Sequence, residues 1–261
     1  MYYFLHIHKT GGSTFQGILN RNFHKQEILD IPRIKSTHIY RDINPELLKG
    51  LKMVKGHFLF GIHQLHPGID AKYITMLREP EIRLVSLYHH LLRVPGLPLH
   101  DEIKNRHLSL ADFLNEGLMD IADNGMTRFI AGENPSFGMC NEALFEKAKA
   151  NLDSFFFVGI NEKYEESVVL LGKKMNIRFP YYAKANVNKK RSPLSELDHE
   201  TRLLVDRYSI WDRKLYDYAL ERFTKELSMY PGDLNGDILK LRKGNVWAER
   251  FRKLKGIIRR S

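Results

Sequence analysis

One short polar run in this chain has the residue types and spacing to hold an anion such as phosphate or sulfate. Its glycines let backbone N–H groups approach the anion closely, while its lysine and hydroxyl groups supply further hydrogen-bond donors. A turn whose glycines only ease packing is the structural alternative. We predict the anion site at Lys9, Thr10, Gly11, Gly12, Ser13 and Thr14.

The elements on either side of this run support the anion site. A hydrophobic strand is expected over 2–7 and a helix over 13–22, so the anion would also meet the positive end of a helix dipole. The run differs from a Walker A loop, because its lysine precedes the glycine pair and the loop is shorter. An ATP-dependent kinase is therefore disfavoured and stays open as an alternative.

A second group follows the expected strand over 72–77, which runs into a helix over 80–93. Arg78 stands at the carboxyl end of this strand, where ligands bind in open α/β sheets, and Ser86 lies on the helix. An arginine with a serine hydroxyl makes a good phosphate site. The alternative is that Arg78 pairs with a neighbouring glutamate and Ser86 only packs.

Together the two groups resemble those of sulfotransferases that use 3′-phosphoadenylyl sulfate. The first resembles their 5′-phosphosulfate loop, and the second matches their Arg-x-Pro-x-x-Arg-x-x-Ser-x-Tyr pattern from Arg78 to Tyr88. The sequences of these motifs resemble most those of carbohydrate sulfotransferases of the heparan 2-O and 6-O type and their bacterial relatives. The resemblance covers residues 1 to about 225. Weaker similarities are Lys55-Gly56-His57, Asn124 to Gly132, and Phe157-Val158-Gly159 with Glu162.

The resemblance implies a donor, an acceptor and roles for residues. The donor would be 3′-phosphoadenylyl sulfate, without a metal, and the acceptor a hydroxyl on a carbohydrate or glycoconjugate. Lys9 would stabilise the leaving phosphate, while Arg78 and Ser86 would hold the 3′-phosphate. A basic loop that closes over the nucleotide in this family is assigned to Lys189 and Arg191. We expect the acceptor pocket in variable loops, at 24–45 and 93–108.

An acceptor hydroxyl needs a base, and histidine suits this role near neutral pH. His57 follows a glycine at an expected strand end and resembles the catalytic histidine of the heparan 2-O branch. It is therefore the predicted base. His63, His66 and Glu79 are the alternatives.

The expected fold class is α/β: a single domain with a parallel sheet flanked by helices, which is the P-loop-like sulfotransferase fold, and a helical C-terminal part. We divide the chain into a catalytic domain, 1–230, and a basic amphipathic tail, 231–261. The expected strands lie near 2–7, 52–55, 72–77 and 154–160, and the expected helices near 13–22, 80–93, 109–131, 141–151, 163–175, 195–206 and 209–228.

The charge of the chain is concentrated in its tail. The net charge is +10, and the last 24 residues hold nine basic residues against one acid. Two interpretations stay open: a helix that packs by its apolar face, and one that contacts an anionic membrane surface. We expect no nucleic-acid partner, and the sequence specifies no oligomeric state.

With one cysteine and neither a signal peptide nor a spanning segment recognised, we expect a cytoplasmic enzyme able to associate with membranes. Beside the kinase, the remaining alternative is a non-catalytic protein that binds through its basic tail. Such a protein would not need two separate phosphate motifs.

Overall fold

A parallel sheet forms the centre of the protein. The computed structural model describes residues 1–31, 38–178, 180–182 and 194–258, with side chains through Glu249 in the last helix. The sheet has the order β2-β3-β1-β4-β5, and every neighbouring pair is parallel. The strands are β1 (Tyr2–Leu5), β2 (Ile28–Ile31), β3 (Met53–Gly56), β4 (Lys72–Leu77) and β5 (Phe157–Ile160).

Helices connect and cover the strands. They are α1 (Gly12–Asn22), α2 (His38–Arg41), α3 (Pro45–Lys49), α4 (Pro80–Arg93), α5 (His100–Asn105), α6 (Leu110–Asn115), α7 (Gly125–Ala131), α8 (Glu142–Asp153), α9 (Tyr164–Lys174), α10 (His199–Arg207), α11 (Ile210–Ser228) and α12 (Leu234–Ile258).

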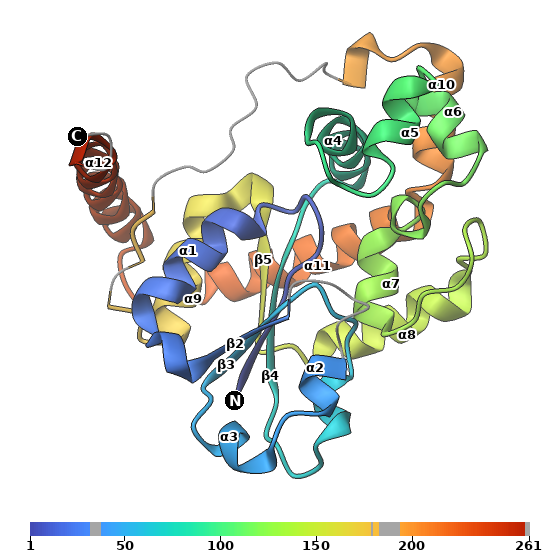
Figure 1. Ribbon diagram of the computed structural model, residues 1–261. Helices are drawn as coiled ribbons and strands as arrows, with labels where there is room; N and C mark the ends of the chain where they lie inside the picture. The colour runs from blue at the N-terminus through green and yellow to red at the C-terminus, as the bar shows by residue number, and fades with distance from the viewer. Residues whose placement is uncertain (32–37, 179, 183–193, 259–261) are drawn as a thin grey trace.

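Successive side chains of β1 point to opposite faces of the sheet, as strand geometry requires. Phe4 packs against Phe15 of α1, with ring centroids 5.1 Å apart. Tyr3 faces the other way, where its hydroxyl lies 2.6 Å from that of Tyr40 in α2. Both faces are therefore covered, with α1 and α9 on one side and α7 and α8 on the other (Figure 1). This is the predicted fold class.

The four predicted strands are present, and β2 was missed inside the segment interpreted as a loop. The loop segments also contain α2 and α5. The single helix predicted over 109–131 is wrong: the segment holds α6, a short 3-10 turn (Asp120–Ala122) and α7. Gly117 and Asn124 have φ of 61° and 49°, a left-handed backbone that cannot continue a right-handed helix.

The C-terminal segment forms α12, which packs on α9. Its buried residue Leu241 joins a small cluster with Ile18 of α1 and with Val168 and Val169 of α9. The tail therefore packs by one apolar face onto the body of the protein. In the described part of the chain, none of the helices is both long enough and apolar enough to cross a membrane.

Candidate active site

The sheet brings three predicted site groups to one edge. Because the strands are parallel, the segments after β1, β3 and β4 emerge at the same carboxyl edge, with β1 between the other two. The His6 N–H donates to the Gly56 carbonyl at 2.9 Å, so His57 lies beside the start of the first turn. From β4, Arg78 Nη1 donates to the Lys9 carbonyl at 3.1 Å.

The segment after β5 contacts and supports the turn after β1. Asn161 donates its side-chain N–H to the Thr10 carbonyl at 3.1 Å, and Thr10 Oγ1 donates to the Ile7 carbonyl at 3.0 Å. Gly11 has φ of 91°, and a Cβ there would collide with the Asn161 amide. Lys9 is also left-handed, with φ of 68°, which is uncommon for a non-glycine residue and typical of functional turns.

Gly11 is the N-cap of α1, and no described side chain makes a capping hydrogen bond there. The first N–H groups of a helix have no partner within the helix. The first turn of α1, which includes Ser13 and Thr14, lies at the positive end of the helix dipole, where anions are favoured. The local geometry agrees with the predicted phosphate turn, while the roles of its residues stay predictions.

The second predicted group divides into a residue at the edge and residues inside α4. Arg78 is buried and reaches the Lys9 turn directly. Ser86 is buried two turns into α4, and its role beside Arg78 stays a prediction. Arg83, the second arginine of the motif, is fully buried and pairs with Asp212 at 3.3 Å. Lys189 and Arg191 lie outside the described residues.

Three histidine rings stack at the strand ends. The His57 ring lies between those of His6 and His8, with centroids 4.3 Å and 3.8 Å away and interplanar angles of 26° and 17°. His57 Nδ1 lies 2.5 Å from the His6 carbonyl oxygen. A carbonyl only accepts, so Nδ1 carries the proton in the neutral ring and Nε2 keeps its lone pair. This tautomer suits a base that acts through Nε2.

Burial lowers the pKa of His57, and the bond to the His6 carbonyl and the charge of Asp30 partly oppose this shift. A ring with a lowered pKa stays neutral over more of the pH range. His57 is therefore in the protonation state that can accept a proton at neutral pH.

The same edge of the sheet is electropositive. The pKa values of His6 and His8 fall well below 6.5, first through burial and then through neighbouring groups that include Lys9 for His6 and Arg83 for His8. The pKa of His90 in α4 is lowered to about 4 by burial, by Lys9 and by Arg93. Such a field attracts an anionic ligand.

The alternative bases make contacts elsewhere. His63 Nδ1 lies 2.8 Å from the Tyr73 hydroxyl, and His66 Nε2 lies 2.6 Å from the Tyr40 carbonyl. Glu79 is the N-cap of α4. Among the described residues, no three His, Cys, Asp or Glu side chains are grouped so as to hold a metal ion.

Sequence reasoning missed His6, His8 and Asn161. A usable signal existed for the two histidines: they are two residues apart at the end of a strand, a spacing that places side chains on one face. For Asn161 there was no such signal, because its contact with Thr10 depends on the packing of β5 and α1.

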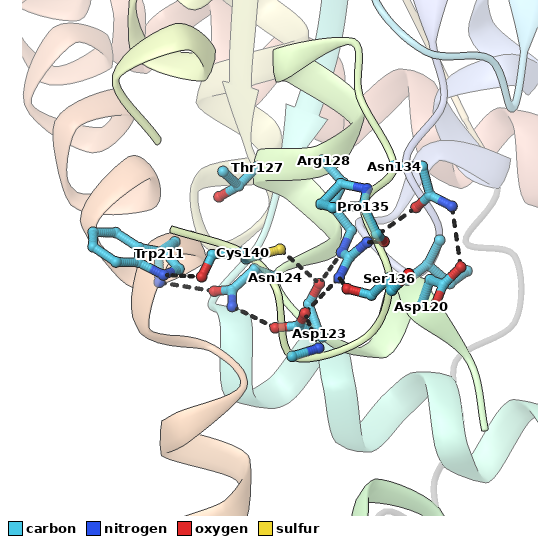
Figure 2. A network of polar contacts seen from close by, with 12 residues as sticks. Asp120, Asp123, Asn124, Thr127, Arg128, Asn134, Pro135, Ser136, Cys140 and Trp211 are labelled. Atoms are coloured by element: carbon cyan, nitrogen blue, oxygen red, sulfur yellow. Dashed lines mark hydrogen bonds and ion pairs between the residues drawn. The ribbon is translucent and has the colours of Figure 1, made fainter. Parts of the chain in front are cut away.

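A largely buried network of polar contacts joins the start of α7 to α11 (Figure 2). Arg128 pairs with Asp123, and both side chains are buried. The Asn124 side-chain oxygen accepts the N–H groups of Trp211 and Asp212, at 2.8 Å and 2.9 Å. This residue therefore caps α11, so the Asn124 segment has a structural role.

Asp212, at the start of α11, in turn caps α7. Its carboxylate accepts the N–H groups of Met126 and Thr127 at 3.1 Å and 2.7 Å, as well as the Thr127 hydroxyl at 2.9 Å. It also pairs with Arg83. One carboxylate thus joins α4, α7 and α11 and sets the place of α4 over the sheet.

Comparison with known families agrees with this geometry. The model of the galactose-3-O-sulfotransferase family matches residues 2–253, nearly the whole chain. The chain belongs to this family. The parallel sheet with its strand-end turns is consistent with membership of the family.

Individual relatives are more distant. Heparan-sulfate 6-O-sulfotransferase 2 of Gallus gallus is 24% identical, with the match covering 84% of this chain and 66% of that protein. Heparan-sulfate 6-O-sulfotransferase 1 of Homo sapiens is 26% identical, over 84% of this chain and 64% of that protein. The chain thus spans slightly less than two thirds of the length of these relatives.

Proposed function

We propose that this protein transfers a sulfuryl group from 3′-phosphoadenylyl sulfate to a hydroxyl of a carbohydrate or glycoconjugate. The observation that carries the proposal is the meeting of the Lys9 turn, Arg78 and His57 at one electropositive edge of the sheet. Family membership supports the same chemistry.

The donor would lie across the ends of β1 and β4. Backbone N–H groups at the start of α1 would bind its 5′-phosphosulfate. Arg78 would bind its 3′-phosphate together with Ser86, and this phosphate would distinguish the donor from ATP and AMP. The hydrogen bond from Arg78 to the Lys9 carbonyl supports this arrangement, because it holds the two phosphate sites next to each other.

The chemical step would exchange one sulfur–oxygen bond for another. The acceptor oxygen attacks sulfur while its proton passes to Nε2 of His57, and the bond between sulfur and the donor phosphate oxygen breaks. Negative charge then grows on that oxygen, where Lys9 stabilises it. As in phosphoryl transfer, the protein mainly aligns the reactants and compensates charge.

A carbohydrate acceptor is supported by the names of the family and the relatives. The family is described as galactose-3-O-sulfotransferase, and the relatives are named for heparan sulfate. The loops predicted to line the acceptor pocket, 24–45 and 93–108, would select among such acceptors.

A kinase is less favoured, because the carboxylates near this edge already have partners within the protein. Kinases use aspartate or glutamate to hold Mg²⁺. Asp30 is already paired with Lys55 at 2.7 Å. The Glu162 carboxylate accepts the Glu79 N–H at 3.2 Å and the Tyr216 hydroxyl at 2.9 Å.

A transfer assay tests the proposal. The full chain is incubated with ³⁵S-labelled 3′-phosphoadenylyl sulfate and a panel of galactose-terminated and glucosaminoglycan acceptors. We expect label in at least one glycan, at least about a hundredfold slower labelling with Lys9→Ala, and normal labelling with the control Lys225→Ala on the exposed side of α11. If no donor breakdown or glycan labelling occurs, or if Mg-ATP serves as the donor of a phosphoryl group, the proposal is wrong.

A further inference from the structure

The outward face of α12 combines apolar and basic side chains. The helix packs through Leu241, which is 1% exposed, while Leu239, Val246 and Trp247 are 55%, 52% and 68% exposed. The inward side is fixed by a hydrogen bond from the Tyr182 N–H to the Asn245 side chain at 2.7 Å. The exposed apolar residues therefore belong to a helix whose orientation on the body is set.

Helical spacing puts these residues on one face. Leu239, Lys243, Val246 and Trp247 follow one another at i, i+4, i+7 and i+8, the positions of one stripe along a helix. Lys243 thus stands among the apolar residues, and Lys240 is exposed on their flank. We call Leu239, Lys240, Lys243, Val246 and Trp247 the outer face of α12.

Acids balance this face only in part, through Asp237. Asp237 is held at the start of the helix by Lys240, at 2.8 Å, and by the Tyr230 hydroxyl, also at 2.8 Å. Arg242 turns toward the body and pairs with Glu165 of α9 at 2.7 Å. Across the last 24 residues, nine basic residues face one acid, so the helix carries a strong positive charge.

We propose that the outer face of α12 binds an anionic bilayer surface, with the helix lying in the plane of the membrane. Leu239, Val246 and Trp247 would enter the boundary between headgroups and acyl chains, where tryptophan is favoured. Lys240 and Lys243 would contact lipid phosphates. This proposal is independent of the sulfuryl-transfer chemistry.

The mixture of side chains favours a membrane over other partners. A second copy of the same face would bring like charges together, which disfavours a symmetric dimer. Nucleic acid offers the negative charge, but a phosphate backbone gives no apolar layer for three large exposed hydrophobic side chains. An anionic lipid surface supplies both.

Vesicle binding tests the proposal. The full chain is sedimented with phosphatidylcholine vesicles that contain 30% phosphatidylglycerol and with pure phosphatidylcholine vesicles. We expect binding to the anionic vesicles only, reduced by high salt. The chain has two tryptophans, and a blue shift of fluorescence should occur in the wild type and be absent in Trp247→Phe.

Paired variants separate the outer face from the general surface. Lys240→Glu with Lys243→Glu should weaken binding by roughly thirtyfold or more, since each lysine near an anionic surface is worth about a factor of five. Lys225→Glu is the control matched in charge to the single variant Lys243→Glu. Leu239→Ala should weaken binding, whereas Leu203→Ala, equally exposed at 55% on α10, should not.

Several results would overturn the proposal: no binding to anionic vesicles, equal binding to neutral ones, or equal effects of the outer-face variants and their controls. A blue shift without lipid that tracks self-association in sedimentation velocity would assign the face to a second copy instead. Sulfate transfer to a soluble glycan is measured in parallel. Normal transfer by the outer-face variants shows that they fold, so a failure of membrane binding is separable from a failure of the proposed reaction.

Discussion

Positive charge has different surroundings in two neighbouring regions of this protein. At the junction of α4, α7 and α11, Arg83 pairs with Asp212 and Arg128 with Asp123. At the carboxyl edge of the sheet, burial lowers the pKa values of His6 and His90, and the nearby charge of Lys9 lowers them further.

This difference separates residues that stabilise the fold from residues that would bind a ligand. In the junction, the protein supplies the counter-charge itself, and the same carboxylate caps a helix. At the edge, positive charge raises the local potential, which is favourable for an anionic ligand. Substitutions at the edge should therefore affect turnover, and substitutions at the junction should affect stability.

The largest effect on turnover is expected at His57. Because this ring supplies the base, His57→Ala should slow transfer by roughly 10² to 10⁴ at saturating donor. The wild-type rate should fall as the pH falls through the pKa of His57, which burial sets below 6.5, because the protonated ring cannot accept a proton. The variant should lose this acidic limb, whereas His63→Ala should keep it. A His57→Ala enzyme with normal rate and pH profile would show that this histidine is structural.

At the junction, Asp212→Asn should destabilise the fold by about 3–5 kcal/mol, because Arg83 would stay buried without a counter-charge. Asp217→Asn on the same helix is the matched control. Asp217 pairs with Arg213 at 3.6 Å near the surface, where such a pair is worth at most about 1 kcal/mol. Urea unfolding measures both. Equal losses of stability in the two variants would mean that the buried pair of Arg83 and Asp212 does not stabilise the junction.

Lys9→Ala should lower turnover and leave stability nearly unchanged, the opposite of Asp212→Asn. Turnover should fall by roughly 10² to 10³, the scale for loss of one donor to the charge that develops, with a smaller change in donor affinity. Stability should change little, since the Lys9 side chain is only partly buried. The comparison fails if Lys9→Ala unfolds as easily as Asp212→Asn while it retains near-normal turnover.

The smallest effect concerns pH and stability. The pKa values of His6, His8, His57 and His90 are lowered in the fold from 6.5, so the unfolded chain binds more protons below that pH. Stability should be full above about pH 6.5 and decline as the pH falls below it. His8→Phe keeps an aromatic ring in the stack and removes one titrating group. Its melting temperature should fall less between pH 7.5 and 5.5 than that of the wild type, and parallel declines would contradict this assignment.

The two phosphate turns were predictable because each is a local strand–turn–helix boundary. Lys9 and Arg78 stand at such boundaries, and the parallel sheet brings them together without further information. β2 was missed because its four residues include the exposed Asp30 and only Ile31 is buried, so no buried apolar run marks the strand. The break before α7 depends on Asn124, whose conformation is set by its contacts with α11, far away in the sequence.

The histidine stack shows the same limit within the site. His57 was identified from its resemblance to a family position, but its neighbours depend on the register that pairs Leu5 with Gly56. Local patterns thus predicted which residues could act. The side chains that orient them became visible only with the tertiary contacts.

Discrimination between nucleotides tests whether this edge of the sheet binds a 3′-phosphorylated donor. Isothermal titration calorimetry compares 3′-phosphoadenosine 5′-phosphate, AMP and Mg-ATP on the wild type, on Arg78→Ala and on the control Arg202→Ala, which lies on exposed α10. The account predicts that the bisphosphate binds roughly 10- to 100-fold more tightly than AMP, the range for a hydrogen bond to a charged group. Arg78→Ala should remove most of this preference, and Arg202→Ala should keep it. Equal affinity for the three nucleotides, or a preference for Mg-ATP, would contradict the assignment of this edge to a 3′-phosphorylated sulfate donor.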